Sequence, residues 1–323
     1  MAGVGQRTGA ASVTGSNITK GSSNVTTDTA NIAPVFTDVD DVRSRLKQTG
    51  YLADEATATT AFLADRLGKP LLVEGPAGVG KTELARALAQ ATGSELIRLQ
   101  CYEGIDEARA LYEWNHAKQI LAIQAAGQRD WESTKGDIFS EEFLLARPLL
   151  TAISRSEPTV LLIDEIDKAD VDIEGLLLEI LSDFAITIPE MGTVTAARRP
   201  IVLLTSNANR ELSEALKRRC LYLYIDFPDA ALEREILASR VPELPERLAA
   251  EIVRVVGVLR TLDIRKKPSV AETIDWGNTL LAMTTPAEAE AGTIDDSLVA
   301  RTLGVVLKHR PDVKTALREL KLG

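Results

Sequence analysis

The sequence predicts an α/β fold, in which a parallel sheet flanked by helices is followed by a smaller all-helical domain. Short apolar runs alternate with helical patterns between residues 71 and 225, and strands separated by helices indicate a parallel sheet with helices on both faces. After residue 229 no convincing strand pattern remains, and helical stretches fill the chain to residue 323. The expected strands are 71–73, 96–99, 160–163, 201–205 and 221–225.

The chain divides into three parts on composition and pattern. Residues 1–33 consist mainly of Gly, Ser, Thr and Asn, which cannot bury enough apolar surface to offset the entropy of ordering, so we expect a disordered polar tail over residues 1–35. An α/β nucleotide-binding domain is expected over 36–228. It opens with a helix that carries Val42 and Leu46 on one face and a second helix that ends at Gly68. The helical domain is expected over 229–323, and Ser269 and Glu272 form a capping-box pattern that starts one of its helices.

The bulk composition limits the functional classes. Of 323 residues, 45% are hydrophobic and 26% are charged, as in a globular protein with a sizeable core, and the net charge of -10 argues against duplex nucleic acid as the main partner. Cys101 and Cys220 form no spaced framework. No apolar run approaches the roughly 20 residues of a membrane span, and no secretion signal opens the chain. We therefore expect a cytoplasmic protein with no membrane partner.

Residues 75–82 read GPAGVGKT, which fits the phosphate-binding pattern G-x-x-x-x-G-K-[ST] between a strand and a helix. The glycines let backbone N–H groups turn toward phosphate oxygens, and the helix N-terminus adds its positive dipole. Lys81 should reach the outer phosphates, and the Thr82 hydroxyl should ligate Mg²⁺. The expected nucleotide-contacting residues are Gly75, Pro76, Ala77, Gly78, Val79, Gly80, Lys81, Thr82 and Glu83.

A phosphate loop alone does not separate a kinase from an ATP-driven motor. In the stretch TVLLIDEIDKA at 159–169, four apolar residues form a strand that delivers Asp164 to the magnesium ion. Glu165 follows at once, and a carboxylate there can act as the base that polarises an attacking water. Small-molecule kinases need no such base, so Glu165 favours ATP hydrolysis.

Two further segments supply polar groups near the site. The strand at 201–205 leads to Asn207, whose amide can hold the attacking water or touch the terminal phosphate, although Asn is also common in turns. The stretch LSEALKRRC at 212–220 carries arginines that suit an arginine finger reaching a neighbouring subunit. The same cations would also suit a helix C-terminus, where the dipole favours them.

In this order, the motifs resemble those of an AAA+ ATPase over roughly residues 45–285. The resemblance implies a P-loop core with Walker A at 75–82, Walker B at 160–165 and sensor 1 at Asn207. It implies an arginine finger at Arg219, with Arg218 as the alternative, and a helical lid from Asp229. ATP and Mg²⁺ are the implied cofactors.

The segment 101–158 is much longer than the one helix of about 12 residues that would connect two strands. A β-hairpin is expected at 184–200, with its tip at 189–196. Together with this hairpin, the insertion is similar to the MoxR family, and the runs at 100–108, 110–115 and 218–228 resemble the CoxD-type branch. That resemblance implies a hexameric ATPase that matures metalloenzymes with a von Willebrand factor A domain protein.

The lid departs from the family pattern. The family's sensor 2 is an arginine that opens a lid helix, whereas the matching stretch here, 265–276, has Ser269 after its proline. A phosphate contact from the lid would then come from Arg265 or Lys267, or be absent.

Three functions fit these motifs: a ring-forming ATPase that remodels a protein client, a loader or helicase subunit acting on nucleic acid, and a nucleotide-gated scaffold. The acidic charge and the lack of a basic, aromatic-rich stripe count against nucleic acid. Glu165 counts against a scaffold, which needs no base. The expected anchors for a protein client are the insertion, which carries Tyr102, Tyr112, Trp114 and Trp131, and the hairpin. The four aromatic rings could equally serve to pack the insertion onto the core.

Overall fold

The computed structural model describes residues 34–126, 138–292 and 294–321, all within the unit Ile32–Gly323. The tail expected at residues 1–35 therefore lies almost wholly outside the described residues, as does Trp131.

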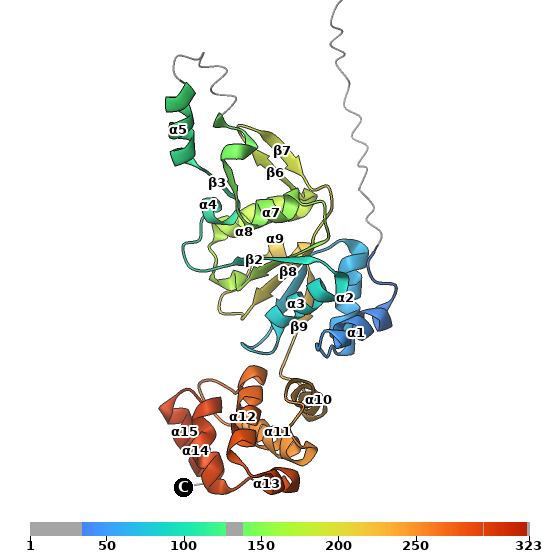
Figure 1. Ribbon diagram of the computed structural model, residues 1–323, viewed down its shortest axis with the longest axis vertical. Helices are drawn as coiled ribbons and strands as arrows, with labels where there is room; N and C mark the ends of the chain where they lie inside the picture. The colour runs from blue at the N-terminus through green and yellow to red at the C-terminus, as the bar shows by residue number, and fades with distance from the viewer. Residues whose placement is uncertain (1–33, 127–137, 293, 322–323) are drawn as a thin grey trace, which may run out of the picture. The chain divides into compact units, whose positions relative to one another are not determined.

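The predicted parallel sheet is confirmed, and each of the five apolar runs is one of its strands (Figure 1). The strand order is β2-β5-β8-β1-β9, and all four strand pairs are parallel. The carboxyl ends of the strands therefore lie at one edge of the sheet, where the polar residues that follow them meet. The strands are β1 (Leu71–Glu74), β2 (Glu95–Gln100), β5 (Thr159–Asp164), β8 (Ile201–Ser206) and β9 (Leu221–Tyr224).

Helices cover both faces of the sheet. One face is covered by α1 (Val39–Gln48), α2 (Glu55–Leu67) and α3 (Lys81–Thr92), which share one hydrophobic core. Val42 and Leu46 of α1 are buried in that core, as the periodicity predicts. Gly68 ends α2 in the left-handed conformation, with φ of 61°, which confirms the predicted stop. On the other face lie α7 (Pro148–Ser154), α8 (Val171–Asp183) and α9 (Glu214–Arg219).

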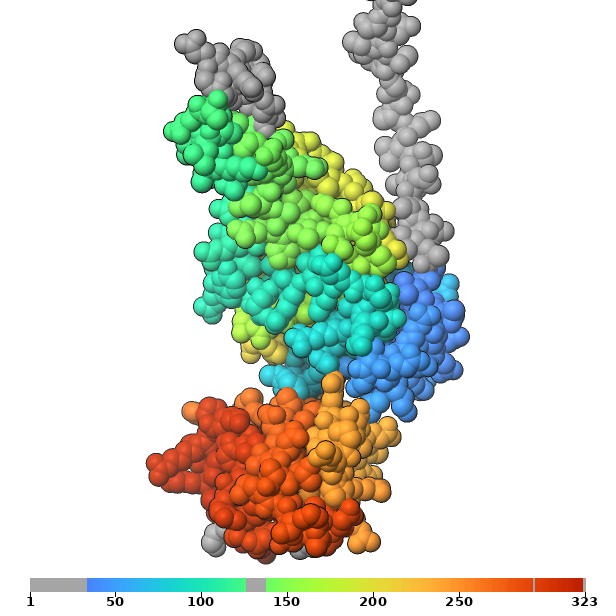
Figure 2. Space-filling view, viewed as in Figure 1, coloured from blue at the N-terminus to red at the C-terminus, as the bar shows by residue number. Residues whose placement is uncertain are grey.

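The insertion and the hairpin are both present. The described part of the insertion contains α4 (Glu107–Ala110), β3 (Tyr112–Trp114), α5 (His116–Ala126), the 3₁₀ turn η1 (Glu141–Phe143) and β4 (Leu144–Ala146), and β3 pairs antiparallel with β4. The predicted hairpin pairs β6 (Ala185–Ile188) with β7 (Gly192–Thr195). Both strand pairs contact α7 (Figure 1). Figure 2 shows both at the surface, the insertion in green and the hairpin in yellow.

The described aromatic residues of the insertion divide between packing and exposure. Trp114 is half-buried, packs on the main core and makes edge contacts with Tyr112 and Phe139, at ring-centroid distances of 6.3 and 5.2 Å. Tyr102 is 39% exposed. The structure therefore favours a packing role for Trp114, while α5 exposes the aliphatic side chains of Ile120 and Leu121.

In the described residues after β9, helices joined by short loops are the regular secondary structure. Its core is separate from the two sheet cores, and the fully buried Trp276 is its largest side chain. Ser269 and Glu272 make the predicted capping box at the start of α12. The separate core supports a boundary near Asp229, which stays a prediction. The helices are α10 (Ala230–Arg240), α11 (Glu246–Thr261), α12 (Val270–Met283), α13 (Pro286–Ala291), α14 (Asp296–Val306) and α15 (Arg310–Glu319).

Within the described ranges, no helix is both long enough and apolar enough to cross a membrane.

Candidate nucleotide site

The phosphate loop lies between β1 and α3, as its pattern requires, and two of its glycines are needed for the close approach of other segments. A Cβ at Gly75 would lie 2.0 Å from the Ile225 carbonyl oxygen, and φ there is 151°. A Cβ at Gly78, where φ is 77°, would lie 2.4 Å from the Cβ of Ser269. Gly75 thus lets the loop pack against the end of β9, and Gly78 lets it pack against the start of α12.

Lys81 begins α3 and is buried beneath the loop. Its Nζ donates to the carbonyl oxygens of Gly75 and Pro76 at 2.7 and 2.8 Å, and to Oδ1 of Asn207 at 2.8 Å. Burial lowers the pKa of Lys81, although the neighbouring carboxylates of Asp167 and Asp164 oppose that shift. An anionic partner stabilises a buried ammonium more than neutral acceptors do, so this position fits a phosphate group.

Asp164 and Thr82 come together as the sequence predicts. Asp164 ends β5 with its side chain only 3% exposed, and Thr82 Oγ1 donates to its Oδ1 at 3.1 Å. Thr205 Oγ1, from the end of β8, donates to the same oxygen at 2.5 Å. A carboxylate beside a threonine hydroxyl is a donor set suited to Mg²⁺, a hard cation that prefers oxygen ligands.

Two side chains of β2 complete this corner of the site, and the sequence reasoning missed both. Arg98 Nη2 pairs with Oδ2 of Asp164 at 2.5 Å and also donates to Oε1 of Gln100. Gln100 lies directly opposite Asp164 in the β2–β5 register. Because side chains alternate along a strand, Arg98 lies on the same face as Gln100. Only the strand register reveals that these residues belong to the site.

Glu165 follows Asp164 in the left-handed backbone conformation, with φ of 57°, which is unusual for a residue with a side chain. Its backbone N–H donates to Thr205 Oγ1 at 3.0 Å. Its Oε2 accepts hydrogen bonds from Gln100 Nε2 at 2.9 Å and from Lys168 Nζ at 2.7 Å. Among the described residues no hydrogen bond reaches Oε1, which leaves that oxygen free to accept a proton. Strained backbone conformations of this kind are common at functional sites.

Asn207 lies just after β8, in a loop that hydrogen bonds to Asp167 stabilise. Its Oδ1 accepts from Lys81, so the predicted sensor residue contacts the phosphate-loop lysine directly. Two residues later, the backbone N and Nδ2 of Asn209 donate to Oδ2 of the buried Asp167 at 3.1 and 2.8 Å. Asp167 thus links the segment after β5 to the loop that carries Asn207.

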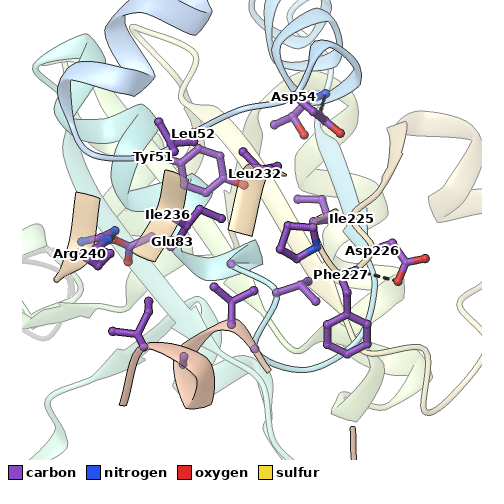
Figure 3. Close-up of a pocket in the computed structure, with 18 of the residues that line it drawn as sticks. Tyr51, Leu52, Asp54, Glu83, Ile225, Asp226, Phe227, Leu232, Ile236 and Arg240 are labelled. Atoms are coloured by element: carbon purple, nitrogen blue, oxygen red, sulfur yellow. Dashed lines mark hydrogen bonds and ion pairs between the residues drawn. The ribbon is translucent and has the colours of Figure 1, made fainter. Parts of the chain in front are cut away.

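Two cavities sharing several lining residues lie along the phosphate loop. The larger, of about 640 Å³, is within the range of ligand pockets. Figure 3 shows its apolar lining, including Tyr51, Leu232 and Ile236. The smaller, of about 310 Å³, is lined by the loop together with Lys81, Thr82, Asp164, Glu165, Thr205 and Asn207. A cavity lined by apolar side chains together with charged ones such as Asp54 and Asp226, beside a cavity with a buried lysine, fits a nucleotide, with its base in the first and its phosphates in the second.

Glu83 lines both cavities, and its role as a nucleotide-site residue stays a prediction. Its Oε1 accepts from Arg240 Nη2 at 2.8 Å, which ties α3 to the helical domain at the rim of the larger cavity.

The helical domain contacts the phosphate loop through Ser269 and Val270 and not through the predicted sensor 2 candidates. Ser269 sits against Gly78, and the backbone N–H of Val270 donates to the Gly78 carbonyl oxygen at 3.2 Å. Arg265 and Lys267 are exposed and line neither cavity. The described cations that line the smaller cavity are Lys81 and Arg86.

Arg218 and Arg219 lie at the end of α9, and both are exposed. Arg219 Nη1 donates to the Ser182 hydroxyl, and neither arginine lines either cavity. The structure therefore brings together the predicted loop residues, Asp164, Glu165 and Asn207, but not Arg219. That separation is what an arginine acting on a neighbouring subunit requires, and the role of Arg219 stays a prediction.

Comparisons with known proteins agree with this geometry. Residues 70–220 match the AAA domain of the dynein-related subfamily. The chain is 34% identical over 143 residues to the chaperone protein ClpB 1 of a Nostoc species. This match covers 43% of this chain and 14% of that protein. It is 30% identical over 167 residues to the chaperone ClpB of Enterococcus faecalis, covering 50% and 17% of the two chains.

A third relative is the ATP-binding subunit ClpL of the ATP-dependent Clp protease of Lactococcus lactis, which is 35% identical over 138 residues. That match covers 42% of this chain and 16% of the relative, so the similarity is to one part of much longer proteins. The five-stranded parallel core with its helical lid is that of AAA+ P-loop proteins, and the matched segment contains the whole phosphate loop, Asp164, Glu165 and Asn207. Residues 70–220 are therefore similar in sequence to an AAA domain, and the described core has the fold of AAA+ P-loop proteins.

Proposed function

We propose that this chain is an AAA+ chaperone of the MoxR type that hydrolyses ATP to remodel or activate a protein client. The observation that carries the proposal is the meeting of Lys81, Asp164, Glu165 and Asn207 at the carboxyl edge of one sheet, beside a complete phosphate loop. The similarity to ClpB and ClpL proteins supports a chaperone over a nucleic-acid loader. The inserted β3–β4 segment and the β6–β7 hairpin support the MoxR type.

ATP hydrolysis needs a phosphate grip, a metal site and a base, and this chain has residues for each. The loop N–H groups and Lys81 bind the phosphates, with Lys81 exchanging carbonyl acceptors for phosphate oxygens. Thr82 and Asp164 would hold Mg²⁺, which when bound neutralises negative charge on the phosphates. Glu165 accepts the proton of the attacking water through its free Oε1. Asn207 orients groups near the terminal phosphate, since its amide already lies against Lys81.

The proposed setting is a hexameric ring in the cytoplasm, working with a von Willebrand factor A domain partner in metalloenzyme maturation. The exposure of both arginines at the end of α9 supports a ring, because each can reach a neighbour. Cys101 and Cys220 are free thiols, which supports a reducing compartment.

Arg219→Ala should bind ATP with wild-type affinity and hydrolyse it orders of magnitude more slowly, because a finger arginine stabilises charge that develops in the transition state. Steady-state phosphate release and fluorescent nucleotide binding measure the two effects. Mixing Arg219→Ala with Glu165→Gln chains should restore part of the activity, since each supplies the group that the other lacks. Arg218→Ala is the matched control and should keep most activity. No recovery in mixed assemblies shown to have formed would contradict the assignment of Arg219.

The hairpin is the proposed point where ATP-driven movement reaches the client. Deleting residues 189–196, the tip that the sequence indicates, would remove all of β7, because that strand occupies Gly192–Thr195. The loop between the strands is only 189–191, so replacing Pro189, Glu190 and Met191 with Gly-Ser-Gly is the cleaner change.

The loop variant should retain ATP hydrolysis and assembly while losing client activation per ATP. The measurement is client activity gained per phosphate released. A matched control replaces Pro242 and Glu243, an exposed proline and glutamate in the loop after α10, with Gly-Ser. If the loop variant activates its client as efficiently as the wild type, the movement is delivered elsewhere, and the insertion at 101–158 becomes the better candidate.

A further inference from the structure

Arg98 occupies an unexpected position for a cationic side chain in a nucleotide site. It extends from the sheet-edge strand β2, and its Nη2 lies 2.5 Å from Oδ2 of Asp164. Asp164 is the residue whose carboxylate is expected to face the divalent cation. The Arg98 side chain is 44% exposed while that of Asp164 is 3% exposed, so the arginine reaches inward from solvent to pair with a buried acid.

Both oxygens of Asp164 are already engaged in this arrangement. Oδ1 accepts from the hydroxyls of Thr205 and Thr82, and Oδ2 accepts from Arg98, with a longer contact of 3.4 Å to Thr82. The hydroxyls are neutral and compatible with a metal ion, and Thr82 is itself an expected ligand. The guanidinium is different, because a positive charge in contact with Oδ2 repels a divalent cation approaching the same carboxylate.

We propose that Arg98 is an internal competitor of the metal ion: it neutralises Asp164 while the site lacks a cation and must release Oδ2 when Mg²⁺ binds with nucleotide. The exposure of Arg98 gives the side chain room to swing outward, whereas the buried carboxylate stays in place. Arg98 is thus a positioning residue that sets how strongly nucleotide binding depends on Mg²⁺. The inference rests on the proposed function, because it assumes the same magnesium-dependent site.

The proposal has a thermodynamic signature. Mg²⁺ and nucleotide strengthen each other's binding, and the coupling equals the ratio of nucleotide Kd without Mg²⁺ to Kd with saturating Mg²⁺. In the wild type, the free-energy cost of separating Arg98 from Asp164 lowers that coupling. Removing the arginine should increase the ratio, because the cation meets a free carboxylate while metal-free phosphates lose a nearby positive charge.

The test is titration of the full chain with fluorescent mant-ADP, in EDTA and in saturating Mg²⁺, for the wild type and three variants. Arg98→Gln should raise the Kd ratio about tenfold, equivalent to about 1.4 kcal/mol of coupling. Arg98→Lys retains a cation and should stay near the wild-type ratio. Arg155→Gln is the matched control. Arg155 pairs at 2.8 Å with Glu95, which lies on β2 like Arg98, and it makes no ion pair with Asp164. Melting temperatures without ligand show whether each variant folds.

The outcomes separate support for the competition, its failure, and failure of the proposed function. A raised ratio in Arg98→Gln alone supports the competition. An unchanged ratio with equally weakened binding in both conditions would overturn it and make Arg98 a direct phosphate ligand. If Arg98→Gln fails to fold, Arg98→Met is measured in its place, and an unchanged ratio there also overturns the inference. If the wild type itself binds no mant-ADP, the proposed function fails, which is a different result from wild-type binding with no effect of Arg98.

Discussion

Lys81→Ala is expected to abolish nucleotide binding. The Lys81 ammonium is buried at the turn of the phosphate loop, held by two carbonyl oxygens and Asn207, where phosphate oxygens would replace those acceptors. Charge-assisted hydrogen bonds to a buried cation contribute about 1.5–3 kcal/mol each, so losing two or more should weaken binding by roughly a hundredfold or more. Fluorescent ATP titration measures the Kd directly.

Lys69→Ala is the control for this experiment. Lys69 is an exposed lysine just before β1, the strand that leads into the phosphate loop. That variant should bind ATP like the wild type. Wild-type affinity in Lys81→Ala would contradict the assignment of residues 75–82 as the phosphate loop of a nucleotide site.

Glu165→Gln is expected to separate binding from chemistry. Glutamine has nearly the same shape as glutamate and leaves Thr82 and Asp164 in place, so ATP should still bind. It cannot accept a proton from water, and loss of a positioned general base typically slows a reaction by about 10²–10⁴-fold. Rapid quench of radiolabelled ATP should show the nucleotide persisting intact on the variant.

The control for Glu165→Gln is Asp170→Asn. Asp170 is an exposed acid in the same segment, and its side chain makes no capping hydrogen bond to α8. This variant should hydrolyse ATP normally. Hydrolysis by Glu165→Gln at the wild-type rate would show that another group serves as the base.

Local patterns in the sequence were enough to predict the sheet and most of the site. Apolar runs bounded by helices predict the five strands, and because parallel strands end at one edge, Asp164 and Asn207 had to lie near Lys81. The capping box at Ser269 and the stop at Gly68 also depend only on neighbouring residues.

Features that depend on tertiary contacts could not be predicted in the same way. Arg98 and Gln100 join the site only because β2 pairs with β5 in a register that sets Gln100 opposite Asp164. Asp167 accepts a hydrogen bond from Asn209, which is 42 residues later in the chain, and no local sequence pattern predicts such a contact. The contact of Ser269 with Gly78 exists only once the helical domain has folded, so the sequence does not show that this serine, and neither Arg265 nor Lys267, lies against the phosphate loop.

The hairpin shows the limit of predicting boundaries from sequence. Alternation around Met191 identifies a turn and two strands, but the pattern does not fix where the second strand begins. The structure starts β7 at Gly192, so the connecting loop is shorter than the segment 189–196 that the sequence indicates.

The most direct test of the proposed ATP-driven chaperone is phosphate release from ATP by the purified chain, with Lys81→Ala measured in parallel. The expected result is Mg²⁺-dependent release that stops when EDTA is added and is absent from Lys81→Ala. Equal release by the wild type and Lys81→Ala, or none by the wild type under conditions where it binds ATP and assembles, would contradict the account.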